Sequence, residues 1–307
     1  MSAELAQSWQ LTLPCTKAEA QNIALAEADN DGVVLMVTEE DEASERWRLD
    51  AYFAGKPGAA TVRAVRALAP SAAASKAKPA PIADADWVTL SQAGLEPVRA
   101  GRFFVYTAAY AGAVPPQLRA YRIEASQAFG TGHHETTTGC LMMLDAMKRR
   151  GARVDTLIDL GTGTGLLAFA ALHLWPRAYA TATDIDPIAI EVTAENAAIN
   201  HVLLGQGQRC VALATANGTD DALVQRRAPY DLVIANILAG PLVDMAGDIC
   251  AIAAPHGQIV LAGLLSTQAE AVARAYRRHG CRVAERLVLG DWTILRLRRR
   301  NMATAKH

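Results

Sequence analysis

The chain has 307 residues, enough for two domains, and its 51% content of hydrophobic residues is enough to build a substantial core. A net charge of −1 means that the protein has no overall positive charge to attract nucleic acid. No run of 18 apolar residues predicts a membrane span, and the first residues lack the basic-then-apolar layout of a secretory signal. The five cysteines are scattered and form no C-x-x-C pair, so neither a disulfide framework nor a zinc site is indicated and we expect a reduced, cytoplasmic compartment.

Residues 1–83 are predicted to form a small α+β unit. Alternating apolar residues favour strands, and apolar residues at helical spacing favour helices. The expected strands span residues 9–13, 33–37 and 46–53, and the expected helices span residues 17–28 and 58–68. The stretch 69–81 is rich in alanine, serine, lysine and proline, which is the composition of a flexible loop or linker.

Residues 84–125 are predicted to form a linker or connecting region with short elements of its own. A short helix is expected at 86–95, a strand at 102–107 and an extended piece at 121–125. A longer helix is expected at 135–149, where apolar residues recur at helical spacing.

Residues 126–300 alternate regularly between apolar strands and helical segments. The expected strands span 156–160, 179–184, 209–213, 230–235, 258–262, 281–287 and 292–297, and the expected helices span 166–174, 187–199, 239–252 and 267–278. Such alternation favours an α/β domain with a mostly parallel sheet covered on both faces. The last two strands are joined by a Leu-Gly-Asp turn, so they should form a hairpin that places one antiparallel strand in this seven-stranded sheet.

The first strand of this domain runs into a glycine-rich turn. Gly161, Gly163 and Gly165 have the spacing G-x-G-x-G, and Asp184 ends the next strand. Glycines let a backbone approach a ligand, a helix N-terminus offers free N–H groups, and a carboxylate accepts hydrogen bonds from ribose hydroxyls. Leu166 stands where a dinucleotide fingerprint has its third glycine, which argues against NAD or FAD and favours S-adenosylmethionine, whose ribose would meet Asp184. The alternative is a tight strand–helix turn that binds nothing.

Asn236 follows the apolar strand 230–235 at the edge of the sheet where a ligand is expected. An amide at this place would accept a hydrogen bond from an amine nucleophile and hold the nitrogen lone pair in line with a methyl group. The position alone fits equally well an asparagine that caps the following helix.

A second unusual stretch, F-G-T-G-H-H-E-T-T-T, spans residues 129–138. Two glycines before a hydroxyl-rich helix start are typical of a loop that folds over a ligand, with Phe129 stacking on it and Thr137 donating a hydroxyl bond. The alternative is an ordinary capped helix N-terminus. His133 and His134 are adjacent, so they diverge by about 100° on a helix and do not form a metal-binding pair. We therefore expect no metal site.

Other polar residues near these segments fit structural roles. Asp186 and Pro187 have the residue types of a helix cap and of the first helical position. Asn196 and Asn200 lie on that helix and fit surface or packing groups. The arginines within 296–300 fit a solvated, frayed C-terminal tail, with contact to RNA left open.

From about Trp87 to the C-terminus, the chain resembles the methyltransferase family that modifies large-subunit ribosomal protein eleven. The segments that carry this resemblance are, in chain order, F-G-T-G-H-H-E-T-T (129–137), D-L-G-T-G-T-G (159–165), D-I-D-P (184–187), E-N-A (195–197) and V-I-A-N-I-L-A-G-P-L (233–242). The first and the last are much more specific than the glycine turn, which all Rossmann-like methyltransferases share.

The resemblance implies a Rossmann-like, S-adenosylmethionine-dependent methyltransferase domain, with the small N-terminal domain gripping the substrate. It implies methyl transfer to lysine or N-terminal amines of large-subunit ribosomal protein eleven, free or on the ribosome, with no direct nucleic-acid binding needed. The implied cofactor contacts are Thr137, Gly161, Asp184 and Asn236, with Phe129, Gly130, Thr131, Gly132, Gly163 and Gly165 lining the same site. The alternative is a class I methyltransferase that acts on another protein, RNA or a small molecule, because these enzymes share the glycine turn.

Overall fold

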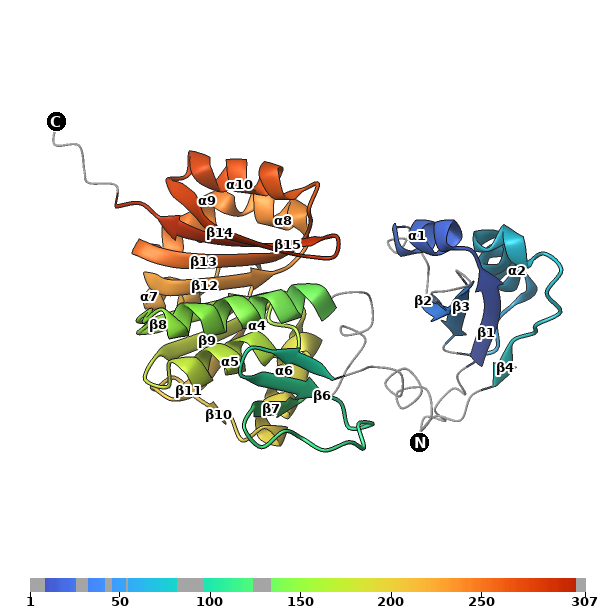
Figure 1. The fold of residues 1–307 in the computed structure, drawn as a ribbon, viewed down its shortest axis with the longest axis horizontal. Coiled ribbons are helices and arrows are strands. Elements are labelled where there is room, and N and C mark those ends of the chain that lie inside the picture. The colour runs from blue at the N-terminus through green and yellow to red at the C-terminus, as the bar shows by residue number, and fades with distance from the viewer. Residues whose placement is uncertain are drawn as a thin grey trace. The chain divides into compact units, whose positions relative to one another are not determined.

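The computed structural model describes residues 9–25, 33–41, 46–53, 55–81, 97–123 and 134–301 (Figure 1). The chain divides into two compact units, Met1–Gly94 and Leu95–His307. Among the described residues, no helix has both the length and the apolar character needed to span a bilayer.

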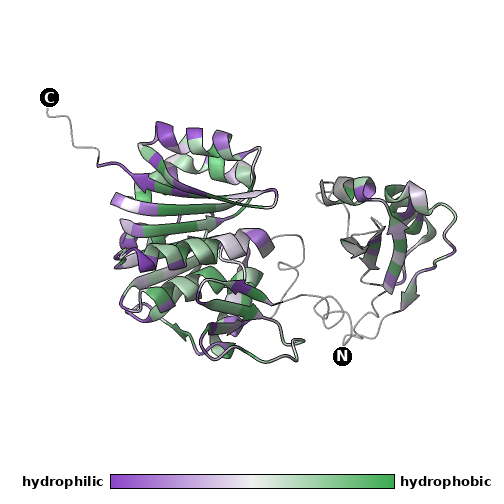
Figure 2. Cartoon of the chain, viewed as in Figure 1, coloured by the Kyte–Doolittle hydropathy of each residue, from purple (hydrophilic) through white to green (hydrophobic). Residues whose placement is uncertain are grey.

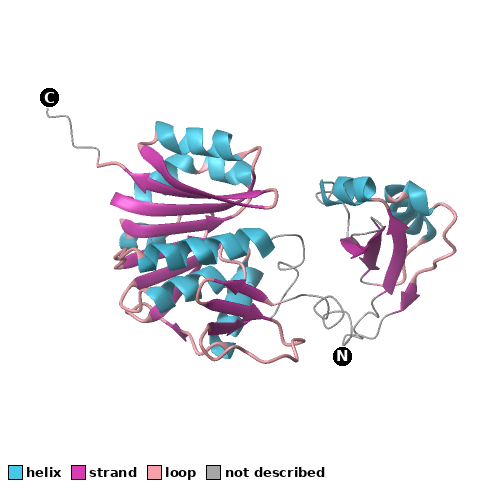
Figure 3. Cartoon of the chain, in the orientation of Figure 1, coloured by secondary structure: helices cyan, strands magenta, loops and turns pink. Residues whose placement is uncertain are grey.

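The N-terminal unit is an antiparallel sheet with the strand order β2-β3-β1-β4, packed against helices (Figure 3). Its elements are β1 (Trp9–Cys15), α1 (Lys17–Leu25), β2 (Val33–Asp41), β3 (Arg46–Phe53), α2 (Ala59–Leu68), a 3₁₀ turn (Pro70–Ala72) and β4 (Ala80–Pro81). Leu11 and Leu13 on β1 are fully buried, while Thr12 and Pro14 between and after them are exposed. One face of the sheet therefore builds the core, and the strands and helices expected from periodicity are confirmed where the structure describes them.

The stretch 69–81, expected to be a flexible loop or linker, is a loop within this unit and not a linker between units. Ala72 is buried, and β4 pairs with the start of β1. The Arg66 guanidinium on α2 donates hydrogen bonds to the carbonyl oxygens of Ser75 (3.1 Å) and Ala77. Composition is misleading here because small alanine side chains suit a close contact under a helix as well as they suit a linker.

Helix α1 begins with a capping box that also reaches the stretch after α2. The Thr16 amide donates to Glu19 Oε2 (2.8 Å), and the Glu19 amide donates to Thr16 Oγ1 (3.3 Å). The Ser71 amide donates to Glu19 Oε1 (2.8 Å). Desolvation raises the pKa of Glu19, but the hydrogen bonds from Ser71 and Thr16 outweigh it and lower this pKa to about 2.

The larger unit is built on an eight-stranded sheet with the order β10-β11-β9-β8-β12-β13-β15-β14. Its strands are β8 (Thr156–Leu160), β9 (Tyr179–Asp184), β10 (Leu203–Leu204), β11 (Cys210–Thr215), β12 (Tyr230–Asn236), β13 (Ala253–Leu265), β14 (Cys281–Leu289) and β15 (Trp292–Arg299). Neighbouring strands are parallel except at β15, which runs antiparallel to both β13 and β14. The seven expected strands and the terminal hairpin are confirmed. The additional strand, β10, has two residues and is too short to show a period in the sequence.

Helices cover both faces of this sheet (Figure 1). They are α4 (His134–Arg149), α5 (Leu166–Leu174), α6 (Pro187–Ile199), α7 (Ala222–Arg227), α8 (Ala239–Asp244), α9 (Ala246–Ile252) and α10 (Ala269–Arg278). On β12, Leu232 and Ile234 pack in one core with α4 and α5. The alternate residues Val233 and Ala235 pack in a second core with α8, α9 and α10. Both faces are buried, and Figure 2 shows mainly hydrophobic colours along the central strands. The helix expected at 239–252 is two short helices.

Residues 97–123, which belong to the larger unit, form a three-stranded sheet that packs against α4 and α5. Its strands are β5 (Val98–Ala100), β6 (Phe103–Tyr106) and β7 (Arg119–Arg122), with β5 antiparallel and β7 parallel to β6. The Tyr121 hydroxyl on β7 donates to the Phe169 carbonyl on α5 (3.0 Å). The expected helix at 86–95 lies outside the described residues, and the boundaries of the expected connecting region stay predictions.

Asn200, at the end of α6, is hydrogen-bonded to the backbone of β7. The Arg122 amide donates to Asn200 Oδ1 (2.8 Å), and Asn200 Nδ2 donates to the Arg122 carbonyl (2.7 Å). The side chain thus pairs with β7 as a neighbouring strand would, which confirms its expected packing role.

The arginines expected in a frayed tail belong in part to β15, which corrects that expectation. Arg296 donates to Glu285 on β14 (3.0 Å) and to Gln258 on β13 (3.0 Å). Arg299 donates to the carbonyl oxygen of Ala251 (3.0 Å). The long arginine stems lie along the sheet while their charged ends find partners, so a run of arginines does not end the strand.

Candidate cofactor-binding site

The turn between β8 and α5 has a shape that needs glycine. Gly161, Gly163 and Gly165 have φ angles of 68°, 55° and 84°, in the left-handed region. A Cβ atom on Gly165 would lie 2.5 Å from Phe169 Cζ and 2.8 Å from Thr193 Cγ2, so this glycine allows a close helix contact. A Cβ atom on Gly163 would meet no described heavy atom within 4 Å. The turn is therefore tightly packed at Gly165, while its backbone borders open space at Gly163.

Two side chains of α6 fix the carbonyl groups of this turn. Thr193 Oγ1 donates to the Gly163 carbonyl (2.8 Å), and Asn196 Nδ2 donates to the Thr164 carbonyl (3.1 Å). Both side chains are fully buried. With the carbonyls held inward, the amide groups of the turn are oriented by the fold rather than by a ligand. The sequence analysis found Asn196 as a packing group but did not single out Thr193, because a polar residue inside a helix gives no sign of its partner.

Asp184 ends β9 next to the glycine turn. Its Oδ2 accepts a hydrogen bond from the Gly163 amide (2.9 Å), and its Oδ1 accepts one from the Asp186 amide (3.1 Å). A carboxylate has about four acceptor sites, so capacity for ribose hydroxyls remains on this partly exposed side chain. Asp186 caps α6 by accepting from the Ile188 amide (2.9 Å), with Pro187 at the start of the helix, as predicted.

Asp159, the acid of β8, stands in the D-L-G-T-G-T-G segment, but the sequence analysis assigned it no role. Its side chain is buried, and Oδ2 accepts hydrogen bonds from Thr162 Oγ1 (2.8 Å) and the Ala168 amide (3.1 Å). Oδ1 is buried and has no hydrogen-bond partner among the described residues. Burial raises the pKa of Asp159 to about 7, the charge of Asp184 adds to the rise, and the two hydrogen bonds oppose it. The available signal was an acid that ends an apolar strand directly before the glycines.

Thr137 on α4 and Asn236 at the end of β12 lie together, although 99 residues separate them. Asn236 Nδ2 donates to Thr137 Oγ1 (3.4 Å), and Thr137 is buried. Among the described residues none donates to Asn236 Oδ1, so this oxygen can accept another hydrogen bond. The cap of α8 is Leu238, which makes no side-chain cap bond, so Asn236 does not cap that helix.

The register of the sheet brings these groups to one edge. Leu160 at the end of β8 pairs with Thr183 on β9 and with Ala235 on β12. The glycine turn, Asp184 and Asn236 therefore follow the ends of three neighbouring parallel strands, which is where ligands bind in open α/β sheets.

Part of the expected site lies outside the described residues. Phe129, Gly130, Thr131 and Gly132 belong to that part, and their predicted role in lining the site stays a prediction. The described helix α4 starts at His134. Within the described ranges, no three His, Cys, Asp or Glu residues are grouped in a way that would hold a metal ion.

The described groups fit S-adenosylmethionine. Gly163 offers backbone bordering open space, and Asp184 offers acceptors for ribose hydroxyls. The amide of Asn236 adds polar atoms at the same edge. A cofactor with hydroxyls, an ammonium group and no phosphate matches a site rich in acceptors.

The chain was compared with known proteins. A family model described as "Ribosomal protein L11 methyltransferase (PrmA)" matches residues 2–300. A ribosomal protein L11 methyltransferase from Caulobacter sp. (strain K31) is 40% identical over 269 residues, which cover 88% of this chain and 89% of the relative. One from Brucella suis (strain ATCC 23445 / NCTC 10510) is 37% identical over 297 residues, which cover 96% and 100%. A crystal structure of a ribosomal protein L11 methylase from Lactobacillus delbrueckii subsp. bulgaricus is similar with a TM-score of 0.55 and 25% identity, over 67% of this chain and 98% of that one.

Proposed function

The chain belongs to the ribosomal protein L11 methyltransferase family, and we propose that it transfers methyl groups from S-adenosylmethionine to lysine or N-terminal amines of ribosomal protein L11. The observation that carries this proposal is the contact between Thr137 and Asn236 at the same sheet edge as Gly163 and Asp184. This contact brings the two most specific sequence segments together beside the glycine turn.

The residues that would hold the cofactor come from three strand ends and one helix. The turn from Gly161 to Gly165 would lie against it, Asp184 would accept from its ribose hydroxyls, and Thr137 would add a hydroxyl contact. When bound, S-adenosylmethionine supplies a methyl group on a positive sulfonium, an electrophile strong enough to need neither a metal nor a covalent nucleophile.

The amine that accepts the methyl group must be neutral and aligned. Asn236 Oδ1 is free to accept an N–H bond from the amine, which would hold the nitrogen lone pair in a fixed direction. A lysine has a pKa near 10.4, and desolvation on entering the site lowers it. We assign no dedicated base, and water would take the proton as the amine enters. Alignment of this kind contributes several kcal/mol to a methyl transfer.

The N-terminal unit would select the substrate. We assign substrate recognition to residues 1–83, connection to 84–125 and catalysis to 126–300. The partner would be ribosomal protein L11, free or on the ribosome, with no direct nucleic-acid binding required, in the cytoplasm. The rival is a methyltransferase that acts on another protein, RNA or a small molecule.

The test is intact-mass spectrometry of isolated ribosomal protein L11 after incubation with the purified full chain and S-adenosylmethionine. We expect mass steps of one methyl group, with peptide mapping placing them on lysine or N-terminal amines. Asp186→Asn is the matched control for an Asp184→Asn variant, because Asp186 lies only two residues beyond Asp184 at the end of β9 and, of the two, only Asp184 contacts the glycine turn. Cofactor binding by calorimetry without any mass change would reject L11 as the substrate and keep the methyltransferase reaction.

A further inference from the structure

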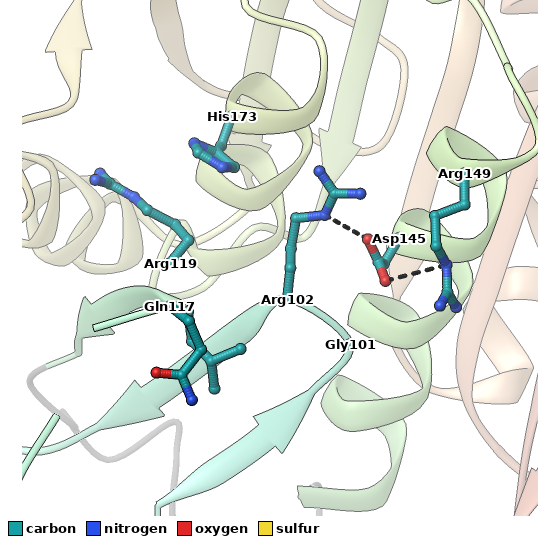
Figure 4. Close-up of a pocket in the computed structure, with 8 residues that line it drawn as sticks. Gly101, Arg102, Gln117, Arg119, Asp145, Arg149 and His173 are labelled. Atoms are coloured by element: carbon teal, nitrogen blue, oxygen red, sulfur yellow. Dashed lines mark hydrogen bonds and ion pairs between the residues drawn. The ribbon is translucent and has the colours of Figure 1, made fainter. Parts of the chain in front are cut away.

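A cavity of about 650 Å³ opens where the small sheet β5–β7 meets the C-terminal ends of α4 and α5 (Figure 4). Asp145 and Arg149 reach it from α4, His173 reaches it from α5, and Arg102 and Arg119 come from the small sheet. Asp145 is eight residues beyond Thr137, so the cavity lies about 12 Å further along α4 than the candidate cofactor contact. It is a separate site.

Two of the three guanidinium groups in this cavity share one carboxylate, that of Asp145. Arg102 Nε donates to Asp145 Oδ1 (2.5 Å), and Arg149 Nε lies 3.5 Å from Asp145 Oδ2. Arg119 stacks over the Tyr121 ring at 5.0 Å and has no carboxylate partner among the described residues. With three positive side chains and one negative, the lining carries a surplus of two positive charges.

The hydrogen-bond donors of these arginines are only partly used. Arg102 and Arg149 each engage Asp145 through Nε, and their terminal amino groups have no hydrogen-bond partner among the described residues. Figure 4 shows Nε of Arg102 directed at Asp145, with His173 and Arg119 on the opposite side of Arg102 from Asp145. The side chains of Arg102 and Arg149 are 40% and 67% exposed, so an ion from solvent can reach them.

The arrangement is built into the fold. Gly101, in the turn between β5 and β6, has a φ of +57°, and a Cβ atom there would lie 2.6 Å from Asp145 Oδ2. The turn that carries Arg102 therefore closes directly on the carboxylate, whose side chain is 4% exposed. The His173 ring packs edge-on against Phe103 with its centroid 6.1 Å away. Asp145 thus fixes two guanidinium groups, and a charge surplus remains.

The pKa of His173 is sensitive to the positive charges around it. Desolvation lowers the pKa of His173, and the charges of Arg119 and Arg102 lower it further. The same positive potential favours an anion, whose arrival would favour the charged form of the imidazole.

We propose that this cavity binds a phosphate group, either as free inorganic phosphate or as a phosphodiester of a nucleic acid. The planar, forked donors of arginine suit phosphate oxygens, and a surplus of two positive charges matches a phosphate dianion. The proposal does not depend on methyl transfer, because none of these side chains belongs to the cofactor edge.

The first experiment is calorimetric titration of inorganic phosphate into the full chain. Arg119→Gln and Arg149→Gln each remove one charged donor, and each should weaken binding about ten-fold or more. Arg177→Gln is the matched control, because Arg177 is exposed on the same unit, does not line the cavity and gives the same change of net charge. Thermal unfolding of each variant shows whether it is folded.

The second readout is the titration of His173 by NMR, assigned with His173→Gln. Phosphate should raise the His173 pKa in the wild type and in Arg177→Gln, and the shift should shrink in Arg119→Gln. A short single-stranded RNA that competes with phosphate and binds more tightly identifies a phosphodiester ligand, whereas phosphate binding without RNA binding identifies free phosphate. The proposal is overturned by a lack of saturable phosphate binding with an unmoved His173 titration, or by an Arg177→Gln control that weakens binding as much as the cavity variants do.

Discussion

Both units bury a carboxylate on a strand, and they treat it in opposite ways. Asp50 on β3 of the N-terminal unit is satisfied through both oxygens; its donors are Gln10 Nε2 (2.9 Å), Thr12 Oγ1 (2.6 Å) and Arg48 Nε (2.7 Å). Asp159 on β8 of the larger unit has a buried oxygen with no described partner. Satisfied buried polar groups belong to the fold, whereas an unsatisfied one calls for a reason. At Asp159 burial raises the pKa to about 7, and a protonated carboxyl is buried at lower cost than a carboxylate.

The same contrast holds for glycine. Gly165 in the larger unit has a left-handed φ and no room for a side chain, whereas a Cβ atom on Gly58 before α2 would meet no described heavy atom within 4 Å. Chain segments therefore approach closely at Gly165, whereas the space beside Gly58 is open.

The largest predicted effect comes from this glycine pair. Gly165→Ala should destabilise the larger unit by about 2 to 5 kcal/mol, since it adds left-handed strain to a clash with Phe169. Gly58→Ala should change stability by less than about 0.5 kcal/mol. Urea unfolding with hydrogen exchange read separately in each unit measures both. Equal effects at the two positions would remove the contrast.

The next largest effect concerns Asp50 and Asp159, whose substitution by asparagine should lower the free energy of unfolding by unequal amounts. Asp50→Asn should lower the free energy of unfolding by about 1.5 to 3 kcal/mol at neutral pH. The substitution removes charge-assisted hydrogen bonds and places the new amide NH₂ group against the donors of Gln10 or Arg48. Asp159→Asn should cost much less at the same pH, because it removes a buried charge while an amide oxygen can still accept from Thr162. Urea unfolding at neutral pH compares them. A larger loss for Asp159→Asn would contradict the account.

Asp159 also makes a prediction about pH. Its pKa is about 7 in the folded chain, against an ordinary value of 3.8 when the chain is unfolded, so between these values the folded chain holds a proton that the unfolded chain has lost. Stability from this group therefore falls as pH rises from about 4 to 7, by at most about 1.4 kcal/mol per pH unit. Unfolding measured across this range should show that slope in the wild type and lose it in Asp159→Asn. An unchanged slope in the variant would exclude a raised pKa.

The smallest effect concerns Glu19, whose pKa is shifted the other way. Its folded pKa of about 2 lies below the ordinary glutamate value of 4.5, so its contribution is present above pH 4.5 and is lost as pH falls toward 2. The site is exposed, so Glu19→Gln should cost at most about 1 kcal/mol at neutral pH and nothing near pH 2. Hydrogen exchange of α1 peptides at both pH values would detect it, and a loss of equal size at low pH would point to packing instead of charge.

Periodicity and spacing are enough to predict much of the larger unit. The strand ends, the glycine turn, Asp184 and the cap at Asp186 follow from short sequence patterns. The contact of Asn236 with Thr137 and the bond from Thr193 to Gly163 join distant segments, and no local pattern states them. Nor does any local pattern reveal the unpartnered oxygen of Asp159, because only burial in the assembled sheet makes it unusual.

Two errors have a common physical origin. Composition suggests a linker at 69–81, and charge suggests a solvated tail for the arginines of β15. In the first case the loop bonds to α2 and ends in the short strand β4, and in the second the backbone is paired in the sheet and the long side chains reach partners. Composition describes side-chain preference, and it does not show whether a neighbouring strand is present.

The most direct test of the central claim is the single-turnover rate of methyl transfer by Asn236→Ala with saturating S-adenosylmethionine. If Asn236 aligns the amine at the cofactor edge, the rate should fall about a hundred-fold while cofactor affinity and thermal stability stay close to those of the wild type. A variant that keeps the full rate would remove Asn236 from the mechanism and contradict the assignment of this edge as the site of methyl transfer.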